Sequence, residues 1–145
     1  MAAWPGGWPR VIGRPGLLDD AGAWLDTCCR RAYQVGSCVV AVDELAGVAT
    51  ASDPPPWLDV LQSRGRDPGP QGPITTVIAT QRPRRIPMTV ISEAEHVFAF
   101  DVSQPADRAY LADLFGGFWT PAHRHGSLYW RPDLAGPVEV APLRV

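Results

Sequence analysis

The feature that most constrains the fold is a short apolar run that ends on two adjacent carboxylates, within the segment Gly36 to Leu45, GSCVVAVDEL. Cys38 to Val42 is continuously apolar and shows no period-two alternation, which predicts a parallel strand covered on both faces. Asp43 and Glu44 would then emerge at the carboxyl end of that strand. Open α/β sheets bind ligands at this end, because the loops that leave parallel strands form a crevice there.

Four apolar residues followed by Asp and Glu form the Walker B pattern, in which the Asp holds Mg²⁺ through water and the Glu polarises the attacking water. The pattern also arises structurally, since many buried strands end in acidic residues that cap the next helix. A second stretch favours the functional interpretation. Thr75 to Thr80 is rich in β-forming residues and is followed by Gln81, Arg82 and Pro83. We therefore expect two strands to present polar tips together.

Composition limits the class of protein. A chain of 145 residues with 46% hydrophobic and 19% charged residues fits one globular domain. The net charge of −2 carries no nucleic-acid signature, although arginines gather near the middle of the chain. The three cysteines lack C-x-x-C spacing, so neither a disulfide framework nor a zinc site is expected. No apolar run approaches the ~20 residues of a membrane span, and we expect a cytoplasmic protein without one.

Helices and strands alternate along the predicted chain. Asp19 and Asp20 are candidate N-caps of a helix that runs through Val35 and ends at Gly36, with Cys28 in its core-facing side. After the strand over 38–42 we expect a helix over 57–64, a strand over 75–80, a short helix or turn over 88–95, a strand over 96–100, a helix over 105–115 and a hairpin of 127–131 with 138–140. The crossover between the first two strands is long enough to make them parallel neighbours.

Four segments, GSCVVAVDEL, LQSRGRD, TTVIATQRPRRIP and HVFAFDVSQPADRAYLADLFG, resemble in order and spacing the nucleotide-binding core of the FtsK/HerA superfamily of P-loop motor ATPases. The ATQRP strand tip is the most specific of them. The resemblance covers Arg10 to Gly116, about three quarters of the chain. It implies an α/β fold of P-loop NTPase (RecA-like) type with a mainly parallel sheet. Around this core, 1–9 would be an irregular lead-in and 117–145 a C-terminal hairpin extension, all within one domain.

The resemblance also implies roles for residues at the two strand tips. Asp43 matches the Walker B Asp that holds Mg²⁺ through water, and Glu44 matches the catalytic carboxylate. Gln81 resembles the strand-end residue that senses the γ-phosphate of ATP or positions water. Thr80 beside it is a second candidate for contact with the nucleotide.

An arginine of such motors is offered to the nucleotide of a neighbouring subunit, and Arg64 or Arg66 resembles it. Such a residue raises the rate by ~10³ to 10⁵, because it neutralises charge on the phosphoryl oxygens. The alternative for both arginines is a solvated loop. By resemblance, the expected partners are copies of this chain or other ATPase subunits in a ring, with double-stranded DNA as a candidate cargo.

The phosphate-binding motif of the family is missing. The sequence contains no G-x-x-x-x-G-K-[ST] and no lysine in a Gly-rich loop. The chain therefore resembles the C-terminal part of an ATP-driven DNA translocation or packaging motor: a truncated or split product, a fragment, or a derivative that has lost hydrolysis. ATP and Mg²⁺ are the implied cofactors, and we expect the chain alone to hydrolyse ATP no faster than background.

Two other interpretations stay open. One is a non-catalytic interaction module that keeps the ATPase-derived fold and binds ATPase subunits or nucleic acid. The other is a flavodoxin-like α/β domain with no nucleotide role, which leaves ATQRP and the adjacent Asp43 and Glu44 without an explanation.

Overall fold

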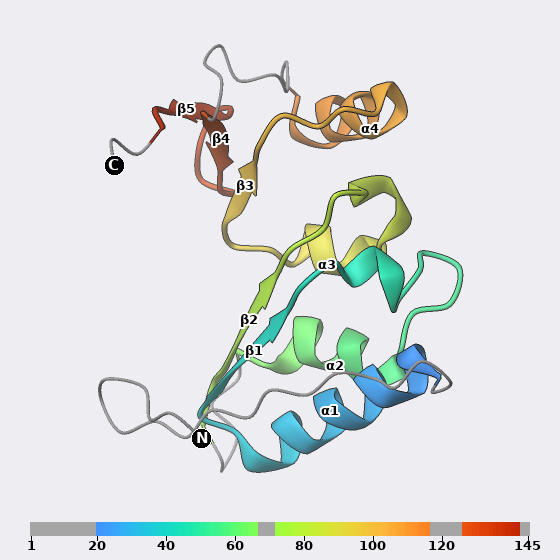
Figure 1. Ribbon diagram of the computed structural model, residues 1–145. Coiled ribbons are helices and arrows are strands. Elements are labelled where there is room, and N and C mark those ends of the chain that lie inside the picture. Colours follow the sequence, from blue (N-terminus) through green and yellow to red (C-terminus); the bar gives the residue numbers. More distant parts are fainter. Residues whose placement is uncertain (1–19, 67–71, 117–125, 143–145) are drawn as a thin grey trace.

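The structure is a computed structural model that describes residues 20–66, 72–116 and 126–142 (Figure 1). The expected lead-in over 1–9 lies outside these residues. Along the chain the elements are α1 (Ala21–Val35), β1 (Cys38–Val42), the 3-10 helix η1 (Leu45–Gly47), α2 (Pro56–Arg64), β2 (Ile74–Ile78), the 3-10 helix η2 (Pro83–Arg85), α3 (Met88–Ser92), β3 (Val97–Ala99), α4 (Pro105–Phe115), β4 (Ser127–Trp130) and β5 (Val138–Val140). The fold is mixed α/β.

The strands form two separate sheets. β1 and β2 pair in parallel, in a register that runs from Cys38 opposite Ile74 to Val42 opposite Ile78. β3, β4 and β5 form a second, antiparallel sheet in that order. The predicted parallel pair and the predicted C-terminal hairpin are both confirmed.

The described residues do not form the mainly parallel sheet that was expected. Their one parallel pair is β1 with β2. The third predicted strand, β3, pairs antiparallel with β4 through Val97 opposite Trp130. The reason lies in the chain between β2 and β3, where η2 and α3 intervene and carry β3 to the neighbourhood of β4 rather than to the edge of β2 (Figure 1).

α1 begins and ends at the predicted residues. The Asp20 side chain accepts a hydrogen bond from the Ala23 N–H at 3.1 Å, and the Gly36 N–H closes the last turn on the Ala32 carbonyl. The buried side of the helix differs from the prediction, since Leu25 and Cys29 are 2% and 0% exposed while Cys28 is only partly buried. Two adjacent cysteines are equally apolar, so the sequence pattern had no means of choosing between them.

α2 packs against α1, and one hydrogen bond sets how they meet. The Asp26 carboxylate on α1 accepts from the Trp57 N–H in the first turn of α2 at 2.7 Å. A carboxylate is favourable there because the first amides of a helix have no partner within the helix and carry partial positive charge. The helices bury an apolar core against the sheet; it includes Leu25, Cys29, Leu45, Leu58, Leu61 and Ile74.

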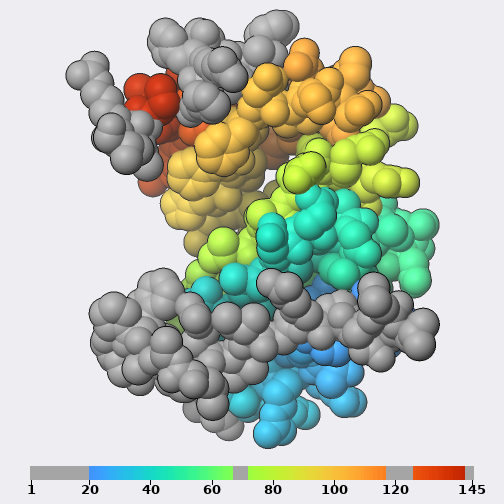
Figure 2. All heavy atoms as spheres, in the orientation of Figure 1, coloured from blue at the N-terminus to red at the C-terminus, as the bar shows by residue number. Residues whose placement is uncertain are grey.

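No described helix or strand covers the opposite face of the parallel sheet. Val39 and Val77 are 58% and 55% exposed, and burial alternates along β1 instead of being continuous. The prediction of a strand covered on both faces is therefore wrong. Both α1 and α2 lie on the same side of the strands (Figure 1), and atoms of the two strands reach the surface (Figure 2).

Candidate functional site

The carboxyl ends of β1 and β2 lie side by side, as the sequence predicted. Two backbone hydrogen bonds extend the ladder past the strands, from Ala79 N–H to the Val42 carbonyl at 2.9 Å and from Leu45 N–H to the Ala79 carbonyl at 3.0 Å. This continued pairing brings the residues that follow β1 next to those that follow β2. We call the edge made by Asp43, Glu44, Thr80 and Gln81 the strand-tip site.

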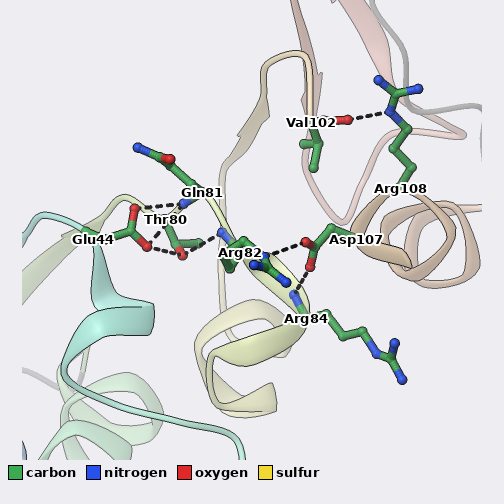
Figure 3. A network of polar contacts seen from close by, with 8 residues as sticks. All are labelled: Glu44, Thr80, Gln81, Arg82, Arg84, Val102, Asp107 and Arg108. Atoms are coloured by element: carbon green, nitrogen blue, oxygen red, sulfur yellow. Dashed lines mark hydrogen bonds and ion pairs between the residues drawn. The ribbon is translucent and has the colours of Figure 1, made fainter. Parts of the chain in front are cut away.

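Glu44 bridges the two strand tips. One oxygen of its carboxylate accepts a hydrogen bond from the Thr80 hydroxyl at 3.2 Å, and the other accepts from the Gln81 N–H at 3.1 Å (Figure 3). The backbone of Glu44 is left-handed, with φ 50° and ψ 60°. A non-glycine residue in this region costs about 1–2 kcal/mol, which hydrogen bonds to a charged acceptor can offset. The carboxylate is thus held in place by the protein itself.

The side chains of Asp43 and Gln81 are both exposed. Asp43 is exposed, and no described residue bonds its carboxylate. Figure 3 shows the Gln81 side chain extending away from Glu44, while its backbone N–H faces that carboxylate. Mg²⁺ is usually held by one or two carboxylates together with water and substrate phosphates, so this donor set fits the metal half of a nucleotide site. The described residues contain no cluster of three or more metal-binding side chains.

The turn that follows Thr80 is fastened by a residue that sequence reasoning missed. The carboxylate of Asp107 on α4 accepts from the Arg82 Nε–H at 3.0 Å and from the Arg84 backbone N–H at 3.0 Å (Figure 3). Asp107 is only 1% exposed. Since a buried carboxylate must be paired to remain charged, this ion pair is part of how the turn and α4 hold together.

A signal for Asp107 was present in the sequence. It lies on the same helix face as Leu111 and Phe115, at spacings of four and eight residues, and all three are buried. A charged residue on the apolar stripe of a helix indicates a buried partner. The partner could not be identified from the pattern, because Arg82 is far away in the sequence.

The two arginines expected to act on a neighbouring subunit are both exposed at the end of α2. Arg66 forms ion pairs with Glu93 at 2.9 Å and Glu95 at 3.1 Å, in its own chain. Arg64 has no ion pair with any described residue, so it is the freer of the two. A role towards another subunit stays a prediction for both.

The arginines nearest the strand-tip site do not form a phosphate cradle. Arg84 and Arg85 are exposed, and Figure 3 shows the Arg84 guanidinium pointing away from the Glu44 carboxylate. Arg82 is engaged by Asp107. Among the described residues, no arginine near the strand tips is therefore directed at the Glu44 carboxylate.

Burial raises the pKa of all three cysteine thiols. Burial, with smaller contributions from Cys28 and Asp26, raises the pKa of Cys29 to about 12. Burial also raises the pKa of Cys28 and of Cys38. All three thiols are thus protonated at neutral pH, and a thiol is a poor nucleophile and a poor metal ligand compared with its thiolate.

Comparison with known proteins adds no family. No protein-family model matches the chain, and no curated protein matches it significantly. None of the helices in the described part of the chain combines the length and the apolar character that a membrane crossing requires.

Proposed function

We propose that this chain is an ATPase-like domain derived from an ATP-driven DNA translocation or packaging motor of FtsK/HerA type. It contributes the metal-binding edge of a Mg²⁺–nucleotide site whose phosphate-binding loop comes from elsewhere. One observation supports this most directly: the parallel pairing of β1 and β2 joins Glu44 to Thr80 and Gln81 at a single sheet edge.

Each residue of the edge has a distinct role in this proposal. Asp43, which is exposed and bonded to no other described residue, would hold Mg²⁺ through water. Glu44, fixed by two donors, presents its charge beside the site. Gln81 extends an amide towards a phosphate or a water. Arg64, which no described residue pairs, is the better candidate for reaching the nucleotide of another subunit in a ring.

The same proposal implies that the chain alone is hydrolysis-deficient. Phosphoryl transfer depends mostly on positioning and on charge stabilisation around the phosphates. A P-loop supplies both through a nest of backbone N–H groups and a lysine. All thirteen basic residues of this chain are arginines, so no lysine can take that role. Exposed arginines attract a triphosphate without holding it in line for attack.

A titration followed by NMR tests the proposal. Mg²⁺–ATP added to the purified chain is expected to shift the amide signals of Asp43, Glu44 and Gln81, with weak affinity. Asp43→Asn should remove most of this shift, whereas Asp133→Asn, a carboxylate paired with Arg131 in the β4–β5 turn, should leave it unchanged. Shifts confined to other surfaces would refute the site.

Phosphate release, measured with the same samples, tests the deficiency. Wild type and Glu44→Gln should both stay at background. Clear turnover by the wild-type chain that Glu44→Gln abolishes would mean that the missing motif had been mistaken for a missing function.

A second candidate function is a non-catalytic interaction module, favoured by the uncovered sheet face. Parallel sheets are normally covered on both faces, and here Val39 and Val77 are exposed on one of them. The simplest partner is another subunit of the same ATPase-derived type, including a second copy. Under this alternative, Val77→Lys weakens concentration-dependent association in sedimentation velocity while Val35→Lys, equally exposed at the end of α1, does not. Asp43→Asn would then have no effect on any binding activity.

A further inference from the structure

Asp107 is the most deeply buried charged residue of the described chain, at 1% exposure. Its two carboxylate oxygens are both used, and by the same short turn: one by the side chain of Arg82 and the other by the backbone of Arg84. In the described residues, Arg82 is the only cation that pairs with it. Asp107 therefore bonds the turn at two positions, Arg82 and Arg84.

Hydrogen bonds made by the side chain and by the backbone of Arg82 link Asp107 to the strand-tip site. The Arg82 N–H donates to the Thr80 hydroxyl oxygen at 3.1 Å, and the Thr80 hydroxyl donates to Glu44 (Figure 3). A hydroxyl has one hydrogen. The Glu44 carboxylate can only accept, so that hydrogen is directed to Glu44 while the hydroxyl oxygen accepts from the Arg82 N–H.

The α4 end of this chain is itself held in place. Arg108, the next residue of α4, donates through Nε to the Val102 carbonyl and through a terminal nitrogen to Asp101 at 3.1 Å. These bonds tie the first turn of α4 to the segment before it. Asp107 is thus attached to a fixed helix start, and the turn after Thr80 is fixed relative to that helix.

We infer that Asp107 is a positioning residue for the strand-tip site: it sets the conformation of the 80–84 turn and thereby directs the Thr80 hydroxyl and the Gln81 N–H at Glu44. The inference rests on the proposed function only in treating that edge as the working site. Its physical content, that a carboxylate on α4 determines the donors presented to Glu44, is independent of nucleotide.

Amide hydrogen exchange of the full chain, followed by NMR without nucleotide, tests the inference. Asp107→Asn keeps the shape of the side chain but removes the charge that pairs with Arg82. We expect amide exchange at Gln81 and Arg84 to accelerate about tenfold. The Arg84 N–H loses its charged acceptor on Asp107, and the Gln81 N–H is no longer held towards Glu44 by a fixed turn. Exchange at Ala79, which donates to Val42 in the adjacent ladder, should stay unchanged.

The matched control is Asp101→Asn, which removes an exposed carboxylate that also pairs with an arginine of α4. It should leave exchange at Gln81 unchanged. Unchanged exchange at Gln81 in folded Asp107→Asn would overturn the inference. Equal acceleration at Gln81 and Ala79 would also overturn it, since that result indicates a loss of global stability alone.

A second variant covers the case in which Asp107→Asn does not fold. Arg82→Lys keeps the positive charge beside Asp107 but lacks the Nε–H that bonds it. Selective acceleration at Gln81 is again the expected result, and its absence would overturn the inference. Failure of the proposed function is distinguishable, because it would be seen as missing Mg²⁺–ATP shifts in the wild-type chain.

Discussion

Asp43 and Glu44 are neighbours in sequence with opposite surroundings. Glu44 is half-buried and accepts hydrogen bonds from Thr80 and Gln81, whereas Asp43 is exposed. The two adjacent carboxylates therefore have different roles: Glu44 holds the strand tips together, and Asp43 faces solvent. A substitution that removes only the charge can separate these two roles.

Glu44→Gln should lower the free energy of unfolding by about 1–2 kcal/mol, because one of the two donors then faces an amide NH₂ instead of a charged oxygen. Asp43→Asn should change it little, as surface substitutions usually do. Urea unfolding monitored by tryptophan fluorescence measures both. Equal effects of the two variants would contradict the bridging role of Glu44.

Cys29 predicts how stability depends on alkaline pH. Burial raises its pKa to about 12 in the folded chain, from the 9.0 that is ordinary for a cysteine thiol. Between these values the unfolded chain loses the thiol proton and the folded chain keeps it, so the unfolded state is favoured as pH rises. The stabilisation is complete below pH 9 and is lost towards pH 12. Unfolding measured from pH 8 to 11 should show a shallower decline for Cys29→Ala than for wild type, and parallel declines would contradict this assignment.

At the scale of elements, two helices end on glycine in different ways. Gly116 after α4 has φ 64° and ψ 27°, the left-handed region that asparagine also tolerates. Gly36 after α1 has φ 63° and ψ −176°, a region that is essentially restricted to glycine. Gly36 also makes the sharp connection from α1 into β1, so its conformation determines where the strand begins.

Gly36→Ala should therefore destabilise the protein by about 2–3 kcal/mol, and Gly116→Ala by about 1 kcal/mol. Thermal unfolding followed by circular dichroism compares the two. In the same experiment Gly116→Asn should be close to wild type, while Gly36→Asn should not. An equal loss for the two alanine variants would show that α1 and α4 end in the same way.

At the scale of the whole molecule, the central feature is a two-stranded parallel sheet, and the described helices that pack on it, α1 and α2, lie on the same side. Its inner face packs on α1 and α2, and its outer face exposes Val39 and Val77. An exposed valine gains little from burial within the chain, so a polar replacement there should cost little. The inner face provides the comparison within the same strand.

Val39→Thr should leave the free energy of unfolding nearly unchanged, whereas Val40→Thr, one residue along and packed against the core, should lower it by about 1–2 kcal/mol. Chemical unfolding of the two variants measures this difference. If Val39→Thr were as costly as Val40→Thr, the strand would be covered on both faces, as its sequence alone predicted.

The sequence by itself determined the features that depend on nearby residues or on chain length. Asp20 and Gly36 bound α1 through local hydrogen bonds and backbone conformation. The apolar runs of β1 and β2 and the length of the crossover were enough to predict a parallel pair whose tips meet at Glu44 and Gln81.

Only the tertiary structure decided which surfaces are covered and which distant groups meet. α1 and α2 pack on the same side of the parallel sheet. The order of apolar residues within a strand does not predict on which face of the sheet the helices will pack. β3 pairs with β4 rather than with β2. Strands far apart in the sequence can pair in several ways, and the packing of the whole chain decides which pairing forms. Asp107 meets Arg82 across 25 residues of sequence, since a buried charge takes the partner that folding brings to it.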